Sequence, residues 1–309
     1  MRVGIIGLGN FTENVFKAMN HVAGITVVGG YESIQSQNFT TFSTLDQLID
    51  EVDMVMVLDL LSCQFDTLSH VIRSSKHLYI ESPGLFSRRD LNRLELLANE
   101  AGVVLQIGLK QRFYDFFNDI DKYEVQPRII ESRRYVKFNT NSTQLSVVDD
   151  LMQHDIDIAL KLVNAEVKSV RSTAVGVYYK DPDVVHTRIE FYNGCVANLS
   201  ASKIADKEVH RKEVFQEKFH CSINYLAQLI KVQSNLTNQG DLNENWGVRT
   251  NYSQEKDDYI YTLTKEIQSF VRCITKNVEP IAGISQYLQL QSVTDKIKEQ
   301  LERNFTTNV

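Results

Sequence analysis

An acid and a histidine lie four residues apart near the middle of the chain, at Asp150 and His154. On a helix, two residues with this spacing share one face. Histidine suits proton abstraction near neutral pH, and a carboxylate beside it can orient the ring. The pair could therefore take the proton of a substrate hydroxyl group. Further acids at Asp149, Asp155 and Asp157 crowd the segment, so an exposed polar helix face is the alternative interpretation.

A glycine turn near the N-terminus has the residue types of a phosphate-binding loop. Gly7 and Gly9 follow the apolar run Val3–Ile6 and precede a stretch with helical periodicity. The first glycine permits a tight turn, the second lets the backbone approach a pyrophosphate, and the helix N-terminus offers N–H groups to the anion. Asn10 and Phe11 continue the turn, but the third glycine of the pattern is absent. The turn predicts a dinucleotide site, with a glycine turn of a flavodoxin-like sheet as the alternative.

The choice between two dinucleotides depends on charge around the second predicted strand. Glu32 closes this strand, where an acid can accept hydrogen bonds from an adenosine ribose, although solvated glutamates are also common at strand ends. No lysine or arginine lies between Lys17 and Arg73. A 2′-phosphate would need a cation in that stretch, so we expect NAD rather than NADP.

Metal chemistry is not expected. A site built on His154, Asp155 and Asp157 is disfavoured because adjacent helix residues point about 100° apart, and the chain has no second histidine cluster. The cysteines lack the close spacing of zinc or thioredoxin-like sites, which favours buried thiols in a reducing compartment. They are Cys63, Cys195, Cys221 and Cys273.

Two domains are expected to position these residues. Short apolar runs alternate with helical patterns in the first part of the chain, and each run is apolar on both faces. This is typical of a doubly wound parallel sheet with helices on both sides, which we place at residues 1–112. The predicted strands are Val3–Ile6, Ile25–Val28, Met54–Leu58, His77–Ile80 and Val103–Ile107.

Residues 113–309 read as an α+β domain with a mostly antiparallel open sheet. Asn193-Gly194 predicts a hairpin turn because both residues tolerate positive φ, and Asp149–Val163 is expected to be helical. Two helices, about 255–275 and 284–304, are expected to close this domain. The basic run His210–Lys212 is interpreted as solvated. The predicted strands are Arg128–Phe138, Val167–Tyr178, Val184–Tyr192 and Cys195–Ser202.

Composition sets the class of protein. The 309 residues carry 33 Lys+Arg and 39 Asp+Glu, a net charge of −6, which argues against nucleic acid or an anionic membrane as the partner. The hydrophobic share of 43% is ordinary for a globular chain. No apolar stretch approaches the roughly 20 residues that span a bilayer, and the N-terminus lacks the pattern of a signal peptide. We therefore expect a cytoplasmic protein with a small-molecule substrate.

Four motifs occur in a characteristic order along the chain. They are the turn Gly7–Thr12, Glu81-Ser82-Pro83, Asp150-x-x-x-His154 and the hairpin Phe191–Gly194. In this order they resemble the Gfo/Idh/MocA family of NAD(P)-dependent oxidoreductases over nearly the whole chain. The segment Arg188–Lys203 looks like a narrower branch that includes UDP-N-acetylglucosamine 3-dehydrogenases of lipid A biosynthesis.

The resemblance implies a fold, an assembly and a substrate class. It implies an N-terminal Rossmann domain that binds NAD and a second domain whose open sheet packs against another subunit, in a homodimer or homotetramer. A sugar or nucleotide sugar, with a UDP-sugar preferred, would be oxidised by hydride transfer.

The resemblance also assigns roles to individual residues. His154 would be the base, Asp150 its partner or a ligand of the substrate hydroxyl, and Arg112 a substrate-binding residue. Glu81 and Pro83 would join the glycine turn and Glu32 in holding the cofactor.

The chain departs from the family at the expected reaction centre. Family members usually carry Glu-Lys-Pro, whose lysine assists proton transfer, and Ser82 occupies that lysine position here. Asp59-Leu60 replaces the family's Thr-Pro, and Gln64 replaces a histidine. Lys110 is the nearest residue that could supply the missing cation, although a surface lysine at a strand end is the favoured interpretation. The alternative function is therefore a catalytically impaired relative that binds a nucleotide or sugar as a sensor or assembly partner.

Overall fold

The chain forms two compact units in the computed structural model. The first contains Met1–Tyr114 and Glu255–Leu288, and the second contains Asp115–Gln254 and Gln289–Val309. The structure describes residues 1–7, 12–31, 40–58, 64–81, 86–114, 125–138, 146–178, 181–227, 229–234, 247–251 and 258–306.

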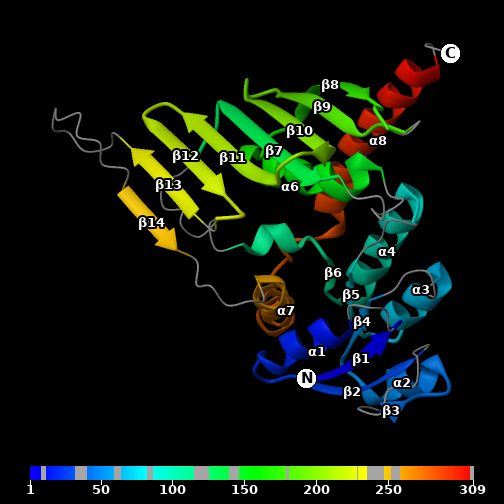
Figure 1. Cartoon of the computed structure of the whole chain (residues 1–309). Coiled ribbons are helices and arrows are strands. Elements are labelled where there is room, and N and C mark those ends of the chain that lie inside the picture. Colours follow the sequence, from blue (N-terminus) through cyan, green and yellow to red (C-terminus); the bar gives the residue numbers. More distant parts are fainter. Residues whose placement is uncertain are drawn as a thin grey trace. The chain divides into compact units, whose positions relative to one another are not determined.

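A parallel sheet forms the centre of the first unit (Figure 1). Its strand order is β3-β2-β1-β4-β5-β6, and every neighbouring pair is parallel. The prediction of a doubly wound parallel sheet is confirmed. The central strands are buried along most of their length, which explains why they read as continuous apolar runs. The strands are β1 (Arg2–Ile6), β2 (Thr26–Tyr31), β3 (Thr40–Thr41), β4 (Met54–Val57), β5 (His77–Ile80) and β6 (Leu105–Ile107).

The connecting helices of this unit carry local signals for where they begin and end. In α4 (Arg88–Ala101) the hydroxyl of Ser87 accepts a hydrogen bond from Asp90 N–H, and Gly102 ends the helix in the left-handed conformation. Leu91 and Leu94 are buried on one face of this helix. The other elements are α1 (Thr12–Asn20), α2 (Leu45–Glu51), α3 (Phe65–Arg73) and the 3-10 turn η1 (Lys110–Phe113).

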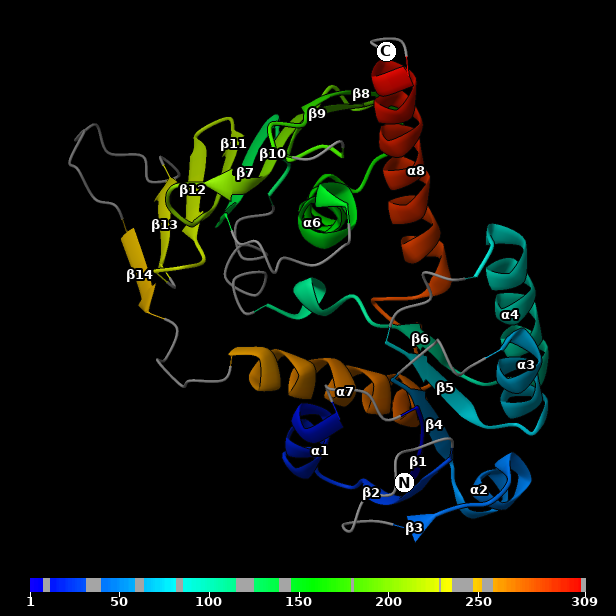
Figure 2. The same ribbon diagram turned by 45° about the vertical axis from the view of Figure 1, so that its right-hand side comes forward.

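Helix α7 (Asp258–Lys276) belongs to the first unit, whereas the sequence analysis assigned it to the second domain. It lies beside α1 (Figure 2). Its buried side chains, Ile260, Leu263, Ile267 and Phe270, share one core with residues of β1, β4 and α1. The spacing of three and four residues gives α7 an apolar stripe, and burying that stripe against the sheet decides where the helix packs.

The second unit is built on an eight-stranded sheet among the described residues, in the order β14-β13-β12-β11-β7-β10-β9-β8. Only the β10–β7 pair is parallel, so the prediction of a mostly antiparallel sheet is confirmed. The predicted turn at Asn193-Gly194 joins β9 to β10, with Gly194 at φ +84°. The strands are β7 (Ile129–Lys137), β8 (Val167–Val175), β9 (Val184–Phe191), β10 (Val196–Ala205), β11 (Val209–Gln216), β12 (Phe219–Asn224), β13 (Leu229–Ser234) and β14 (Gly247–Asn251).

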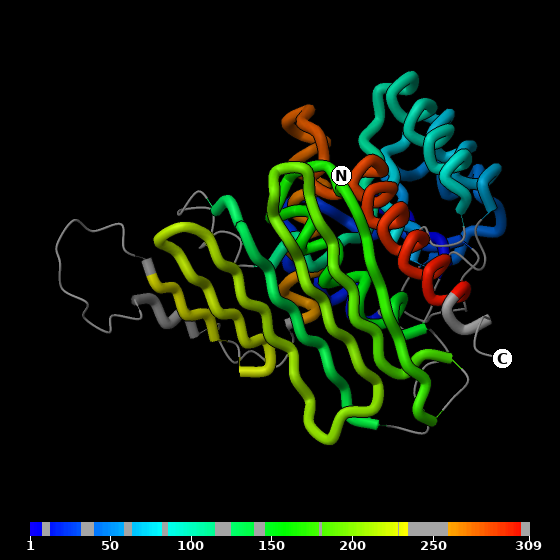
Figure 3. Tube along the Cα trace, turned by 90° about the horizontal axis from the view of Figure 1, so that it is seen from above, coloured from blue at the N-terminus to red at the C-terminus, as the bar shows by residue number. Residues whose placement is uncertain are grey.

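Helices cover one face and one end of this sheet. The π-helical turn η2 (Val148–Met152) leads into α6 (Gln153–Val163), which packs against β10 (Figure 2). Helix α8 (Ile284–Thr306) runs along β8 in its second half, where Gln300 bonds the backbone of Ser172 and Val170 (Figure 3). No helix among the described residues is both long and apolar enough to cross a membrane.

Candidate active site

The first candidate site lies at the carboxyl edge of the parallel sheet. Strand β1 ends at Ile6, and Gly7 turns the chain with φ +74°, a conformation that favours glycine. Gly7 N–H donates to the carbonyl of Tyr31 at the end of β2 at 3.3 Å. The strand order reverses direction between β1 and β4, and ligands of doubly wound sheets bind outside the strand ends at such a point. The predicted cofactor residues Gly9, Asn10, Phe11 and Glu32 lie outside the described residues.

The ends of β5 and β6 approach closely at the same edge. A Cβ atom on Gly108 would lie 2.3 Å from the carbonyl oxygen of Glu81, so only glycine fits there. Gly108 N–H donates to Ile80 at 2.7 Å, and Lys110 follows in η1. This close approach of the two strand ends brings Lys110 near Glu81. Ser82 and Pro83 lie outside the described residues.

Ionisable side chains form a largely buried group beneath this edge. The hydroxyl of Tyr79 donates to Glu81 Oε2 at 2.7 Å, and Lys110 Nζ lies 3.5 Å from the centre of the Tyr259 ring. Burial lowers the pKa of Lys110, although the charges of Glu81 and Glu266 act in the opposite direction. Lys110 is therefore a partly desolvated amine among acids rather than an ordinary surface lysine.

Glu266, from α7, is fully buried in this group, as is Tyr79. Its Oε1 accepts the backbone N–H of Leu109 at 2.9 Å, and its Oε2 has no hydrogen-bond partner within the described part of the chain. Burial, followed by the negative charge of Glu81, raises the pKa of Glu266 well above its ordinary value. The carboxyl group is therefore stabilised in its neutral form, and it holds the segment that carries Lys110.

Replacing Glu266 with glutamine should change how stability depends on pH. Folding raises the pKa of the Glu266 carboxyl. Its contribution to stability is therefore complete at pH values below the pKa of the unfolded state. The contribution is lost as the pH rises through the pKa of the folded state. We expect the melting temperature of the wild type to fall relative to Glu266→Gln as the pH rises above about 4, the ordinary pKa of a glutamate. Thermal melts across this range measure the difference. Glu100→Gln, at an exposed position of α4, should leave the wild-type pH dependence unchanged.

The second candidate site lies in the other unit, where η2 meets α6. Asp150 occupies η2, and His154 follows in the first turn of α6, so the predicted helical pairing is present. Asp150 Oδ2 lies 2.9 Å from Nζ of Lys203 on β10. The alternative of an exposed polar face is wrong for the two later acids of the segment, because Asp155 is only 2% exposed and Asp157 only 1%.

Asp155 is held by a fully buried ion pair with Lys212 of β11, at 2.9 Å. Burial raises the pKa of Asp155, but the charge of Lys212 and its hydrogen bond to the carboxylate outweigh this effect, so the pKa of Asp155 is lowered overall. The ring of His210 stacks on Tyr225 at 3.9 Å, and burial lowers the pKa of His210 to about 3. The interpretation of His210–Lys212 as a solvated segment is therefore wrong for His210 and Lys212, whereas Arg211 is exposed.

Arg112, expected to bind substrate, lies in η1 of the first unit. Its side chain is buried, and Nη1 donates to the carbonyl of Ile281 at 3.2 Å. This hydrogen bond ties η1 to the segment before α8.

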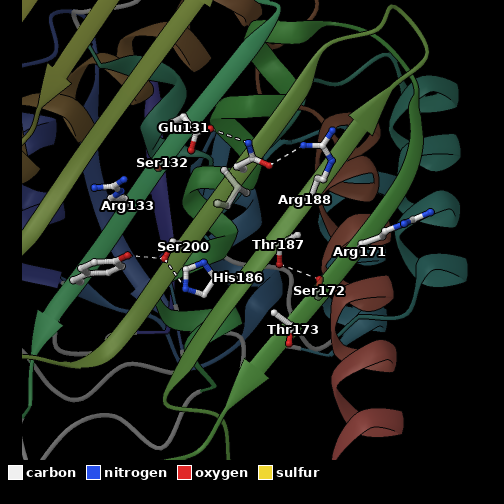
Figure 4. Close-up of a pocket in the computed structure, with 13 residues that line it drawn as sticks. Glu131, Ser132, Arg133, Arg171, Ser172, Thr173, His186, Thr187, Arg188 and Ser200 are labelled. Carbon is white, nitrogen blue, oxygen red and sulfur yellow. Dashed lines mark hydrogen bonds between the residues drawn. The ribbon is translucent and has the colours of Figure 1, made fainter.

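A hollow of about 450 Å³ lies on the other face of the second sheet, over β7, β8, β9 and β10 (Figure 4). Exposed His186 and Arg188 alternate along β9 with buried residues that face α6, which places the hollow away from Asp150. Asn198 bonds Glu131 at 2.8 Å within it. Three arginines line the hollow, Arg133, Arg171 and Arg188.

Residues 1–109 match a family described as an oxidoreductase family with an NAD-binding Rossmann fold. This segment contains β1 to β6 and the glycine turn. These residues belong to the Gfo/Idh/MocA family. The resemblance drawn from the sequence motifs is confirmed.

Individual relatives extend the similarity beyond these residues. UDP-N-acetylglucosamine 3-dehydrogenase of Acidithiobacillus ferrooxidans is 28% identical over 239 residues, 75% of this chain and 76% of the relative. A structure of that enzyme, GnnA, superimposes with a TM-score of 0.83 at 22% identity over 99% of both chains. Scyllo-inositol dehydrogenase from Lactobacillus casei, with bound NAD(H) and scyllo-inositol, gives a TM-score of 0.76 at 15% identity, covering 98% and 97%.

The described part of residues 1–109 fits a dinucleotide, because the parallel strand order and the left-handed Gly7 at the end of β1 supply the required turn. Among the same residues, no three His, Cys, Asp or Glu side chains are grouped as a metal site requires. The sequence analysis missed Lys203, Lys212 and Glu266 as members of charged groups. A lysine directly after the small residues Ser200-Ala201-Ser202 was the available signal for Lys203.

Proposed function

We propose that this protein is an NAD-dependent oxidoreductase that oxidises a hydroxyl group of a sugar or nucleotide sugar, with a UDP-sugar preferred. The observation that carries the proposal is the Asp150–His154 pair on consecutive helical turns, with Asp150 bound to a lysine, in a chain whose first domain is an NAD-binding Rossmann domain. The relative named UDP-N-acetylglucosamine 3-dehydrogenase supports the choice of a UDP-sugar.

Each residue of the proposed site has a separate task. Bound NAD would accept the hydride. His154 would take the hydroxyl proton, because imidazole accepts protons near neutral pH, and Asp150 would orient the ring or bind the hydroxyl group. Arg112 would help to bind substrate. The cofactor would be held by Gly7, Gly9, Asn10, Phe11, Glu32, Glu81 and Pro83.

Turnover and cofactor choice test the proposal directly. We expect NADH to form when the purified protein is supplied with NAD and a panel of sugars and UDP-sugars that includes UDP-N-acetylglucosamine. Nicotinamide fluorescence should show NADH binding in the micromolar range, about −8 kcal/mol, and weaker NADPH binding. The absence of a lysine or arginine between Lys17 and Arg73 supports this order. Tighter binding of NADPH would refute the cofactor preference, and no NADH from any substrate would refute the reaction.

Lys110 is proposed to supply the cation that Ser82 cannot. Its amine is partly desolvated beside Glu81, so it can respond to charge in the site more strongly than a solvated lysine. We expect Lys110→Ala to lower turnover by roughly 10²-fold, the order seen when one electrostatic stabiliser is removed, with little change in NADH affinity. Steady-state rates and fluorescence titration measure the two quantities. Turnover equal to the wild type would remove Lys110 from the mechanism.

A second candidate function follows from the departures at Ser82 and Asp59-Leu60. A protein that had lost hydride transfer could still bind a nucleotide or sugar as a sensor or assembly partner. Tight binding of UDP-N-acetylglucosamine or NADH without NADH production across the panel would favour this function.

A homodimer or homotetramer is proposed to form through the open face of the second sheet. The three arginines and Glu131 around the hollow give this face polar groups that a second copy could pair with. Analytical ultracentrifugation of the full chain tests the assembly, and a monomer alone would contradict it. A cytoplasmic location is proposed from the reducing environment that the scattered cysteines favour.

A further inference from the structure

Lys203 lies where strand β10 departs from regular pairing. The register between β10 and β7 shifts between Ser202 and Ala205, and Ile204 N–H bonds the Ser202 hydroxyl at 3.2 Å. Lys203 N–H donates instead to the carbonyl of Asp183 at 2.9 Å. Such irregularities re-aim a side chain and are frequent beside active sites. The residues before Lys203 on β10 are small and buried, and the irregularity follows them. We infer that it turns the Lys203 side chain toward its contact with Asp150.

The partner of Lys203 also lies in an irregular element. Asp150 is the central residue of the π-helical turn η2, a conformation that is rare and often found at functional sites. The contact between Lys203 Nζ and Asp150 Oδ2 is 2.9 Å, and the two side chains are 10% and 31% exposed. Water therefore screens this pair less than a surface ion pair.

Three acids in this part of the chain each have a lysine from a different element. Lys298 of α8 binds Asp149 at 2.6 Å, Lys203 of β10 binds Asp150, and Lys212 of β11 binds Asp155. The first pair is near the surface and the third is fully buried. Of these three pairs, only Lys203–Asp150 contains the acid that lies one helical turn before His154.

Other charges around this pair do not replace Lys203. His210, also on β11, has its pKa lowered to about 3 by burial, so it is neutral at working pH. Arg134 of β7 acts electrostatically on Asp155, Lys212 and His210. Asp157 is buried on the same helix as Asp155. Lys203 thus brings a positive charge into direct contact with Asp150, at 2.9 Å.

We propose that Lys203 is a positioning residue, which fixes the carboxylate of Asp150 and places a positive charge beside the Asp150–His154 pair. The inference rests on the proposed oxidoreductase function and deepens it. A carboxylate has two oxygens with about four acceptor positions, so the contact through Oδ2 leaves Asp150 able to orient a ring or a hydroxyl group.

The test is a mutant cycle on the full chain with NAD and the sugar substrate that the panel identifies. Lys203→Met removes the charge and keeps the bulk, Lys203→Arg keeps the charge, and Asp150→Asn removes the partner. We expect Lys203→Met to lower kcat/KM by roughly 10- to 100-fold, mainly through kcat, and Lys203→Arg to restore part of the loss. The double variant should be no slower than Asp150→Asn alone, because Lys203 acts through Asp150.

Lys298→Met is the matched control, since it removes a lysine from the neighbouring acid Asp149. It should keep wild-type kcat/KM, and melting temperatures of all variants show that each is folded. Wild-type kcat/KM in Lys203→Met would overturn the role of Lys203 and leave the proposed function standing. The same holds if the losses in kcat/KM of the two single variants multiply in the double variant. A wild type that turns over no member of the panel would overturn the proposed function, and this inference with it.

Discussion

His154→Ala is expected to lower kcat for sugar oxidation by about 10²- to 10⁴-fold, the usual contribution of a general base. Without the imidazole, the substrate hydroxyl must lose its proton to water as the hydride leaves. NADH affinity should stay near the wild-type value, because His154 lies in the second unit and the Rossmann domain is formed by the first. Steady-state kinetics and NADH fluorescence measure these two effects separately.

His21→Ala provides the control for this replacement, because His21 is exposed at the end of α1. It should leave both quantities unchanged. A His154→Ala enzyme with wild-type kcat would show that another group is the base. A parallel loss of NADH binding would instead indicate a general loss of structure.

Lys212→Met is expected to destabilise the protein by about 3–5 kcal/mol, the cost of leaving a buried charge without its partner. The Lys212 side chain is fully buried and Asp155 Oδ1 lies 2.9 Å from its Nζ. Removing the lysine leaves the Asp155 carboxylate inside the unit, where burial disfavours its charge. Urea unfolding monitored by circular dichroism measures the loss.

Two further variants separate charge from packing. Lys212→Met combined with Asp155→Asn should recover part of the loss, since no unpaired charge stays buried. Lys298→Met, which breaks a partly exposed pair, should cost no more than about 1 kcal/mol. Equal costs for Lys212→Met and Lys298→Met would mean that burial does not set the strength of these pairs.

The parallel sheet could be predicted from the sequence because its signal is local. The prediction Val3–Ile6 differs from β1 by one residue, and Met54–Leu58 differs from β4 by one residue. These strands are buried on both faces, so an apolar run marks them without knowledge of their neighbours. The Asp150–His154 pairing was predictable for the same reason, since a helix fixes the relation of residues four apart.

The charged strands of the second sheet could not be predicted in this way. Strand β11 contains His210, Arg211, Lys212 and Glu213, which read locally as a solvated segment. Lys212 is buried because Asp155, 57 residues away in the sequence, neutralises it. Lys203 likewise pairs with a distant acid, Asp150, and this pairing can be seen only in the tertiary structure.

The placement of α7 has a consequence for biosynthesis. The core around β1 and β4 includes Leu263, Ile267 and Phe270, which the ribosome adds after the whole sheet of the second unit. The first unit therefore cannot finish folding in the usual N-terminal-first order and must wait for the late part of the chain. A fragment that ends at residue 114 would expose the surface that α7 covers, and it is expected to aggregate rather than serve as an isolated cofactor-binding module.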